Sequence, residues 1–180
     1  MTNLFFSSDF HFGHANIAGP NSNWKSGYRT FDSVHEMNRT IIDNINKMVG
    51  PQDILYFLGD FCFKQDTRKY LDQITCKNIH AIRGNHDREM RGFASVQTEL
   101  WLDNIFMHHY AHRVWPRSHY GAYHLYGHSH GSLPNDWGRS MDVGIDMAYK
   151  LFGEYRPFAW EEVDAILSKR PIKFVDHHVQ

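Results

Sequence analysis

The chain has 180 residues, of which 42% are hydrophobic, and its formal net charge is −1 at pH 7. This length and apolar content predict one compact domain over residues 1–180 and exclude an intrinsically disordered chain. The near-neutral charge excludes a protein that coats nucleic acid through a large basic surface. Histidine is the unusual component, with 14 copies, and an imidazole that is neutral near pH 7 is a good metal ligand.

In the first half of the chain, predicted strands alternate with predicted helices. Residues 3–8 form a short apolar run that predicts a buried strand ending at Asp9. Ser33 and Glu36 form a capping-box pattern, which predicts a helix that ends at Gly50-Pro51. We also expect a strand over 53–58, a short helix over 67–74 and a strand over 79–82.

In the second half, predicted strands follow one another with loops between them. They cover residues 104–107, 123–126 and 141–145, and a helix over 160–169 precedes Pro171. This order predicts an α/β fold built as a layered sandwich, with ligands collected at strand ends. The segment 111–121 is the least regular, and its aromatic and basic residues make it a candidate binding loop.

The sequence shows no signal for a membrane or an oxidising compartment. Cys62 and Cys76 form no C-x-x-C pair, so both are predicted to be free thiols. No apolar run approaches the roughly 18–20 residues of a membrane span. The first nine residues lack the basic segment of a signal peptide. We therefore expect a cytoplasmic protein.

Five clusters of polar residues follow the predicted apolar strands in a fixed order. They are Asp9-Phe10-His11, Gly59-Asp60, Gly84-Asn85-His86-Asp87, His108-His109 and Gly127-His128-Ser129-His130. Carboxylate oxygen, amide oxygen and imidazole nitrogen suit manganese, iron, zinc or nickel, and the absence of cysteine argues against a structural zinc finger. The carboxylate of Asp60 has two oxygens and can bridge two cations.

These residue types are those of a two-metal phosphoester hydrolase. Two metal ions roughly 3.5–4 Å apart can hold a hydroxide as nucleophile and clamp phosphoryl oxygens. His86 is placed by sequence to give a proton to the leaving alkoxide. Asp87 is placed to orient that imidazole and raise its pKa.

The ordered clusters D-x-H, G-D, G-N-H-D, H and G-H-x-H resemble the motifs of the calcineurin-like metallophosphoesterase superfamily. Residues 8–14, residues 58–61 and His109-Tyr110 are similar to those of its small stand-alone bacterial and phage phosphoesterases. The resemblance implies a four-layer α/β/β/α sandwich that carries the motifs on loops at one edge. It also implies that His86 is the general acid.

The resemblance further implies a ligand set for each of two metal ions. One ion would be held by Asp9, His11, Asp60 and His130. The other would be held by Asp60, Asn85, His128 and one of His108 and His109. We favour His109, because in similar proteins the ligand histidine directly precedes a tyrosine, and His108 is the alternative.

Asn85, His14, Arg83 and Arg113 are the candidates for substrate binding. His14 either touches phosphate or a carboxylate behind the ligands, or only closes the turn at Phe12-Gly13. Arg83 either pairs with phosphate or forms a surface ion pair. Arg113, with Trp115 and Arg117, either stacks on a base or belongs to an ordinary exposed loop. Similar proteins tend to carry Asn where Asp142 stands, so this position departs from the pattern and adds negative charge if it faces the cations.

We expect a dinuclear metal-dependent phosphoesterase that acts on a phosphodiester or phosphomonoester, either a small molecule or a nucleotide, with manganese favoured. Two alternatives stay open. A metal-binding regulatory module without catalysis is disfavoured because neither the acid nor a bridging ligand is missing. A single-strand nuclease is disfavoured by the near-neutral charge, although Trp115 and the nearby arginines would suit short single strands.

Overall fold

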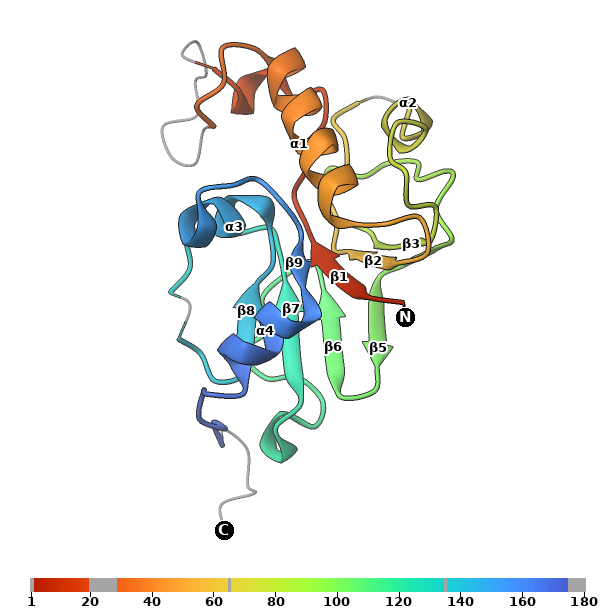
Figure 1. The fold of residues 1–180 in the computed structure, drawn as a ribbon. Coiled ribbons are helices and arrows are strands. Elements are labelled where there is room, and N and C mark those ends of the chain that lie inside the picture. Colours follow the sequence, from red (N-terminus) through yellow and green to blue (C-terminus); the bar gives the residue numbers. More distant parts are fainter. Residues whose placement is uncertain (1, 20–28, 65, 135, 175–180) are drawn as a thin grey trace.

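A computed structural model of the protein describes residues 2–19, 29–64, 66–134 and 136–174. These residues form a mixed α/β fold with two sheets, one of five strands and one of four (Figure 1). Within them, no helix is both long enough and apolar enough to cross a membrane.

The five-stranded sheet has the order β4-β3-β2-β1-β9. Its strands are β1 (Leu4–Ser7), β2 (Ile54–Phe57), β3 (Ile79–Ile82), β4 (Ser95–Gln97) and β9 (Phe158–Ala159). The first four strands are parallel and β9 is antiparallel to β1. The carboxyl ends of β1, β2 and β3 therefore lie at one edge, and three of the five polar clusters follow these strands.

The four-stranded sheet has the order β5-β6-β7-β8. Its strands are β5 (Glu99–Leu102), β6 (Ile105–His108), β7 (Tyr123–Tyr126) and β8 (Ser140–Asp142). Strands β6, β7 and β8 are parallel, and β5 is antiparallel to β6. The remaining two clusters follow β6 and β7.

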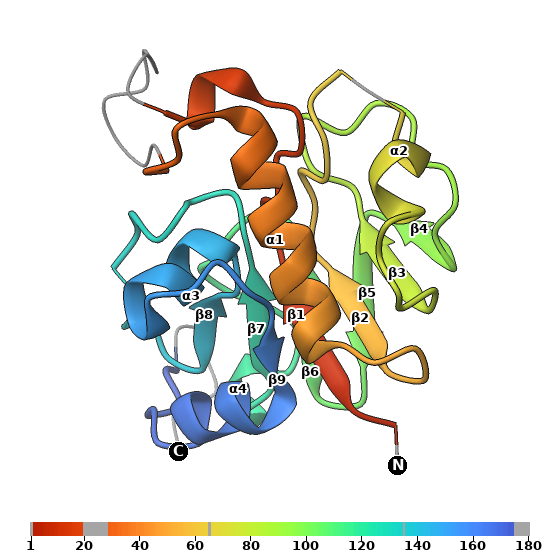
Figure 2. The ribbon, with the colours of Figure 1, turned by 45° about the horizontal axis from the view of Figure 1, so that its top comes forward.

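The helices are α1 (Val34–Met48), α2 (Arg68–Leu71), α3 (Ile145–Phe152) and α4 (Trp160–Leu167), with 3-10 turns η1 (Ala15–Ile17) and η2 (Ser118–Tyr120). The predicted start of α1 is confirmed, since the hydroxyl of Ser33 accepts a hydrogen bond from the amide of Glu36 at 3.1 Å. Figure 2 shows α1 lying across β1 and β2.

Successive side chains of β1 point to opposite faces of the five-stranded sheet and pack into two different core layers. Phe5 belongs to a buried cluster with Met37 and Ile41 of α1, whereas Phe6 belongs to a cluster with Met107 and Leu125 of the second sheet. Because neighbouring residues of a strand point to opposite faces, the first sheet is covered by helix on one side and by the second sheet on the other.

The outer face of the second sheet is covered by the segment 111–122. Phe106 of β6 forms a buried cluster there with Trp115 and Ala122, and the indole N–H of Trp115 donates to the carbonyl of Ala122 at 2.9 Å. The predicted binding loop is therefore partly core. Its tryptophan fills the outer layer of the fold and is not available to stack on a base.

Several elements differ from the sequence-based prediction: helix α3 was not predicted, and α2 is shorter than the helix predicted over 67–74. The strand predicted over 141–145 is wrong in its second half, because β8 ends at Asp142, whose carboxylate accepts from the amide of Gly144 at 2.7 Å. The chain turns there, and α3 begins at Ile145. Strands β4, β5 and β9, with three, four and two residues, were not predicted, because each is too short or too mixed in polarity to give a clear pattern.

His124 is a buried histidine on the outer face of β7, and it predicts an acid-sensitive step in stability. Burial lowers its pKa to about 3, and its Nε2 accepts from the amide of His112 at 2.9 Å. The unfolded chain binds this proton near pH 6.5, so stability falls as the pH drops below that value. We expect His124→Gln to reduce the pH dependence of the unfolding free energy by up to about 1.4 kcal/mol per pH unit.

Urea unfolding of the protein and of the variant between about pH 4 and pH 7 measures this dependence. His35→Gln is the matched control, because His35 is exposed on α1. An identical slope in the protein and in the His124 variant would show that the buried imidazole does not carry this proton linkage.

Candidate metal centre

The five polar clusters meet where strands of the two sheets end. Backbone hydrogen bonds join their loops: the amides of Asp9 and His11 donate to the carbonyls of Gly59 and Asp60 at 2.9 and 3.0 Å. On the second sheet, the amide of Gly127 donates to the carbonyl of His109 at 3.0 Å. Side chains far apart in sequence are thus held side by side.

Two glycines of the motifs are required by how closely these loops approach. A Cβ on Gly84 would lie 2.2 Å from a carboxylate oxygen of Asp60, and a Cβ on Gly127 would lie 2.0 Å from the hydroxyl of Ser8. Any other residue would push these loops apart, so the glycines permit the clusters to converge.

The converging side chains form two groups with metal-binding geometry. Asp9, His11 and His130 form one group, and Asp60, His109 and His128 form the other. In each group the potential ligand atoms all lie within 4.8 Å of one another. These groups match the two sets implied by the family resemblance, except that the first group lacks the shared Asp60 and the second lacks Asn85.

Asp60 belongs to the second group and also lies next to the first. Its Oδ2 is 3.6 Å from Nε2 of His11 and 3.5 Å from Nε2 of His109. One carboxylate oxygen thus faces a ligand histidine of each group, which is the position of a bridging ligand.

The structure places His109 in the centre, and His108 elsewhere. Nδ1 of His109 is 2.7 Å from the carbonyl oxygen of Leu58, and its Nε2 is 3.0 Å from Oδ1 of Asn85. Nδ1 of His108 accepts instead from the amide of Tyr110 at 3.0 Å, and its ring contacts His112, with centroids 4.5 Å apart. Neighbouring residues at the end of β6 point to opposite faces, so only one of the two histidines reaches the centre.

The hydrogen bonds of His109 leave a lone pair that faces an amide oxygen. Burial lowers the pKa of His109 to about 4, so at neutral pH its ring carries one proton. The carbonyl of Leu58 can only accept, which places that proton on Nδ1. Nε2 and Oδ1 of Asn85 are then both acceptors, and a cation between them would satisfy both.

The backbone is strained at the same positions. Among the described residues, eight non-glycine residues have a positive φ, and five of these are predicted ligands: Asp9, His11, Asp60, His128 and His130, with φ between 48° and 65°. A non-glycine residue pays a conformational cost there, and such strain concentrates at functional sites.

The electrostatics of the two groups suit a cation. Burial raises the pKa of Asp9 well above its usual range, and the carboxylates of Asp142 and Asp60 raise it further, against the opposing effect of His130. Burial also raises the pKa of Asp60 and lowers the pKa of His11. Crowded carboxylates and imidazoles form a site whose charge a divalent ion would neutralise while displacing protons. The residues present therefore fit a metal pair.

Asp87 has a different task from the one predicted. Its carboxylate accepts hydrogen bonds from the amides of Asp60, Phe61 and Gly84 at 2.7, 2.9 and 2.9 Å. All the hydrogen bonds of this carboxylate in the described part of the chain are with backbone amides, and none is with the imidazole of His86. Asp87 therefore fixes the loop that carries Asp60 and does not orient His86.

His86 lies at the edge of the centre. Its amide donates to Oδ1 of Asp60 at 2.9 Å, and its Nε2 is 4.0 Å from Oδ2 of the same carboxylate. Its side chain is 36% exposed, so its ring can meet a substrate from solvent. The backbone of the acid candidate is thus tied to the bridging carboxylate.

His14 and Phe63 form the wall behind His86. The ring of His14 stacks on Phe63 with centroids 4.0 Å apart, and lies 5.4 Å from the ring of His11 and 6.0 Å from that of His86. Burial, followed by the charge of His86, lowers the pKa of His14 to about 4. His14 therefore belongs to the centre as a neutral ring beside a ligand.

Sequence reasoning missed the buried arginine that supports the centre. Arg29 is fully buried, and its Nε and Nη2 donate to the two carboxylate oxygens of Asp146 at 2.8 and 2.7 Å. Asp146 also lies 2.7 Å from Nδ1 of His130, and a carboxylate on one ring nitrogen is the usual way to orient a histidine that ligates a metal through the other. Arg29 further donates to the carbonyls of Asp9 and Phe10, so one guanidinium joins α3 to the first motif.

The other predicted contacts lie outside the two ligand groups. Arg83 is exposed and donates to the carbonyl of Arg88. The guanidinium of Arg113 lies 5.0 Å over the ring of Trp137, in a pocket other than the one beside His86. Asp142 is buried beside the centre, where its carboxylate accepts from the amides of Gly131 and Gly144 at 2.9 and 2.7 Å, and burial raises its pKa to about 6.

Comparison with known proteins gives relatives of unassigned function. No family model matches the chain. An uncharacterized protein of Methanocaldococcus jannaschii is 38% identical over 100 residues, which are 54% of this chain and 53% of that protein, so the chain spans about half the length of this curated relative. The crystal structure of a protein of unknown function from Aquifex aeolicus is similar with a TM-score of 0.62 and 20% identity, over 92% of this chain and 100% of that one. At this identity the likeness concerns the fold alone.

Proposed function

We propose that this protein is a dinuclear metal-dependent phosphoesterase of the calcineurin-like superfamily. The observation that carries the proposal is the pair of neighbouring ligand groups joined by Asp60, one carboxylate oxygen of which lies 3.6 Å from His11 of the first group and 3.5 Å from His109 of the second. A bridged pair of sites with oxygen and imidazole donors suits hydrolysis of a phosphoester better than structural binding of one ion.

The residues have distinct parts in this proposal. Asp9, His11, Asp60 and His130 would hold one divalent ion, and Asp60, Asn85, His109 and His128 the other. Two ions held there would supply an activated water and polarise the phosphoryl oxygens. His86, half-exposed beside the centre, would hold the proton that the leaving oxygen takes. Asp87 and Arg29 would keep the ligand loops in place.

The metal and the finer fold class belong to the same proposal. The mixed oxygen and nitrogen donors favour manganese, with iron, zinc or nickel as alternatives. The superfamily's four-layer α/β/β/α sandwich would be present here in reduced form. Helices α1 and α2 would be one outer layer, and the segment 111–122 with its short turn η2 would take the place of the other.

Of the two alternatives, a metal-binding regulatory module would not need a half-exposed histidine beside the bridging carboxylate. A single-strand nuclease loses its main support, because Trp115 is buried and Arg113 lies against Trp137. A small phosphodiester or phosphomonoester substrate is therefore the better match.

The test is steady-state hydrolysis of bis-p-nitrophenyl phosphate and p-nitrophenyl phosphate with manganese, zinc or nickel added. We expect metal-dependent turnover that falls by at least about a thousandfold in Asp60→Asn, because that change weakens the ligand shared by both ions. The ester that is hydrolysed faster would distinguish a diesterase from a monoesterase. Two bound metal ions per chain without turnover of either ester would contradict the proposal.

A further inference from the structure

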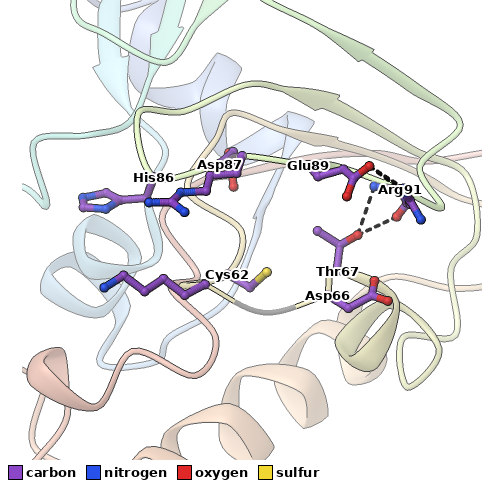
Figure 3. Close-up of a pocket in the computed structure, with 9 residues that line it drawn as sticks. Cys62, Asp66, Thr67, His86, Asp87, Glu89 and Arg91 are labelled. Atoms are coloured by element: carbon purple, nitrogen blue, oxygen red, sulfur yellow. Dashed lines mark hydrogen bonds and ion pairs between the residues drawn. The ribbon is translucent and has the colours of Figure 1, made fainter.

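A pocket of about 360 Å³ begins at His86 and extends away from the metal ligands. It lies between the loop that follows Phe61 and the loop of residues 86–91. Figure 3 shows His86 at one end, Cys62 in the middle, and Thr67, Glu89 and Arg91 at the other end. Its volume is in the range of small-molecule sites.

The far end of this pocket is held together by hydrogen bonds and by one ion pair. The hydroxyl of Thr67 donates to the carbonyl of Arg91 at 2.7 Å and accepts from the amide of Arg91 at 3.0 Å. The guanidinium of Arg91 forms an ion pair with Glu89. Asp66 accepts from the amide of Arg68 at 3.0 Å, at the start of α2.

Two further cations line the pocket without such compensation. Lys64 and Arg88 are both lining residues, and in the described part of the chain neither forms an ion pair with a carboxylate. Lys64 has a left-handed backbone, with φ of 54°. The lining carries three cations and three carboxylates. Glu89 pairs with Arg91, and Asp66 and Asp87 accept hydrogen bonds from backbone amides. Among the described residues, Lys64 and Arg88 are therefore the lining cations that pair with no carboxylate.

Lys64 is connected to the candidate acid through Phe63. The ammonium of Lys64 lies 5.0 Å from the centroid of the Phe63 ring, and that centroid lies 5.8 Å from the ring of His86. The charge of Lys64 is also among those that lower the pKa of His14, after burial and the charges of His86, Arg29 and His130. The cation thus lies on the side of the pocket that meets the metal centre.

We infer that this pocket binds the leaving group of the substrate, and that Lys64 and Arg88 hold a second phosphate carried by that leaving group. This inference rests on the proposed function, in which His86 protonates the leaving oxygen and so marks the side from which it departs. The substrate class is a phosphoester between a phosphoryl group and an alcohol that itself bears a phosphate, such as a phosphorylated nucleoside.

The reaction balances without a further reactant. A water oxygen forms the new bond to phosphorus, the bond from phosphorus to the leaving oxygen breaks with its electron pair on that oxygen, and His86 supplies the proton that this oxygen takes. The proton lost by the attacking water restores His86 by exchange with solvent. The second phosphate changes no bond and contributes binding through its charge alone.

Three thymidine dinucleotides test the inference: TpT, the 5′-phosphorylated form pTpT and the 3′-phosphorylated form TpTp. The phosphate lies on the leaving nucleoside in pTpT if the 3′ oxygen leaves, and in TpTp if the 5′ oxygen leaves. We expect one of the two to have a kcat/KM about tenfold higher than TpT, as two charge-assisted contacts would give. Lys64→Gln and Arg88→Gln should each reduce this ratio. Lys47→Gln, which removes the same charge from a side chain that is 71% exposed on α1, should keep it.

A binding measurement separates this inference from the proposed function. Calorimetric titration with thymidine 3′,5′-bisphosphate and with thymidine 5′-monophosphate should show about tenfold tighter binding of the bisphosphate, lost in Lys64→Gln and Arg88→Gln. Turnover of bis-p-nitrophenyl phosphate with equal rates for the three dinucleotides and equal affinities would overturn the inference and leave the phosphoesterase standing. No turnover, together with a bisphosphate preference that depends on Lys64 and Arg88, would overturn the phosphoesterase and support the anion pocket. No turnover and no preference would overturn both.

Discussion

His86→Gln is expected to lower kcat for a dinucleotide such as TpT by about 10²–10⁴-fold, and to change kcat for bis-p-nitrophenyl phosphate much less. A nucleoside alkoxide is a poor leaving group that needs a proton, whereas p-nitrophenolate leaves without one. The contrast between the two substrates reports on proton donation itself. A general loss of structure would slow both.

His86→Gln should remove the proton donor without removing a predicted metal ligand. The hydrogen bond of His86 to Asp60 comes from the backbone amide, at 2.9 Å, so it survives replacement of the side chain, and only the 4.0 Å approach of Nε2 to that carboxylate is lost. Calorimetric titration with manganese should therefore still show two ions per chain. His35→Gln, an exposed change on α1, is the control. Equal kcat for TpT in the variant and the original protein would remove His86 from the role of acid.

The convergence of the candidate ligands could be predicted from sequence because each of them lies at or just after the end of a strand. A short apolar run that stops at Asp9, or at Gly59-Asp60, gives both the strand and the residue that it delivers. Parallel strands then bring their carboxyl ends to one edge, so an ordered set of motifs converges without any knowledge of register. Five of these residues have left-handed backbone conformations. No residue propensity predicts these conformations, so they are known only from the structure.

The supports of the centre could not be predicted, because they join distant segments. Arg29 and Asp146 are 117 residues apart, and an arginine near the start of the chain carries no signal that it will be buried. Asp87 stands beside His86 in the sequence, which suggested a contact that the turn at Gly84 prevents by aiming the carboxylate at three amides. Adjacency in sequence was a poor guide to adjacency in space.

Composition was also a poor guide in the segment 111–121. Its tryptophan and arginines are typical of a binding loop, but a tryptophan with a large apolar ring also serves as the cover of an open sheet face. Trp115 takes the second role, with its one polar atom satisfied by the carbonyl of Ala122. Composition does not tell which side of the loop faces the sheet. That orientation decides whether Trp115 packs in the core or is available to bind a ligand.

Arg29→Met is expected to cost about 3–5 kcal/mol of unfolding free energy. The substitution keeps much of the side-chain volume but leaves the carboxylate of Asp146 buried without its cation, and it removes donors from the carbonyls of Asp9 and Phe10. Urea unfolding of the metal-free protein at neutral pH measures the loss.

The double variant Arg29→Met with Asp146→Leu separates stability from metal binding. With both charges gone, no buried ion is left unpaired, so we expect it to be more stable than Arg29→Met alone. Its His130 nevertheless lacks the carboxylate that lies 2.7 Å from Nδ1 and sets the direction of the ring. We therefore expect its affinity for one of two manganese ions to remain about 10–100-fold weaker.

Arg156→Met is the matched control for this pair of variants. Arg156 is also buried, and it donates to both carboxylate oxygens of Glu162 at 2.9 and 2.7 Å, but neither residue belongs to a ligand group. Its loss should lower stability and leave both manganese affinities unchanged. If the Arg29 variants and the Arg156 variant all lose stability and all bind manganese like the original protein, then Arg29 and Asp146 are structural supports only. If the double variant binds manganese more weakly than the original protein while Arg156→Met does not, the buried pair of Arg29 and Asp146 acts on the centre through His130.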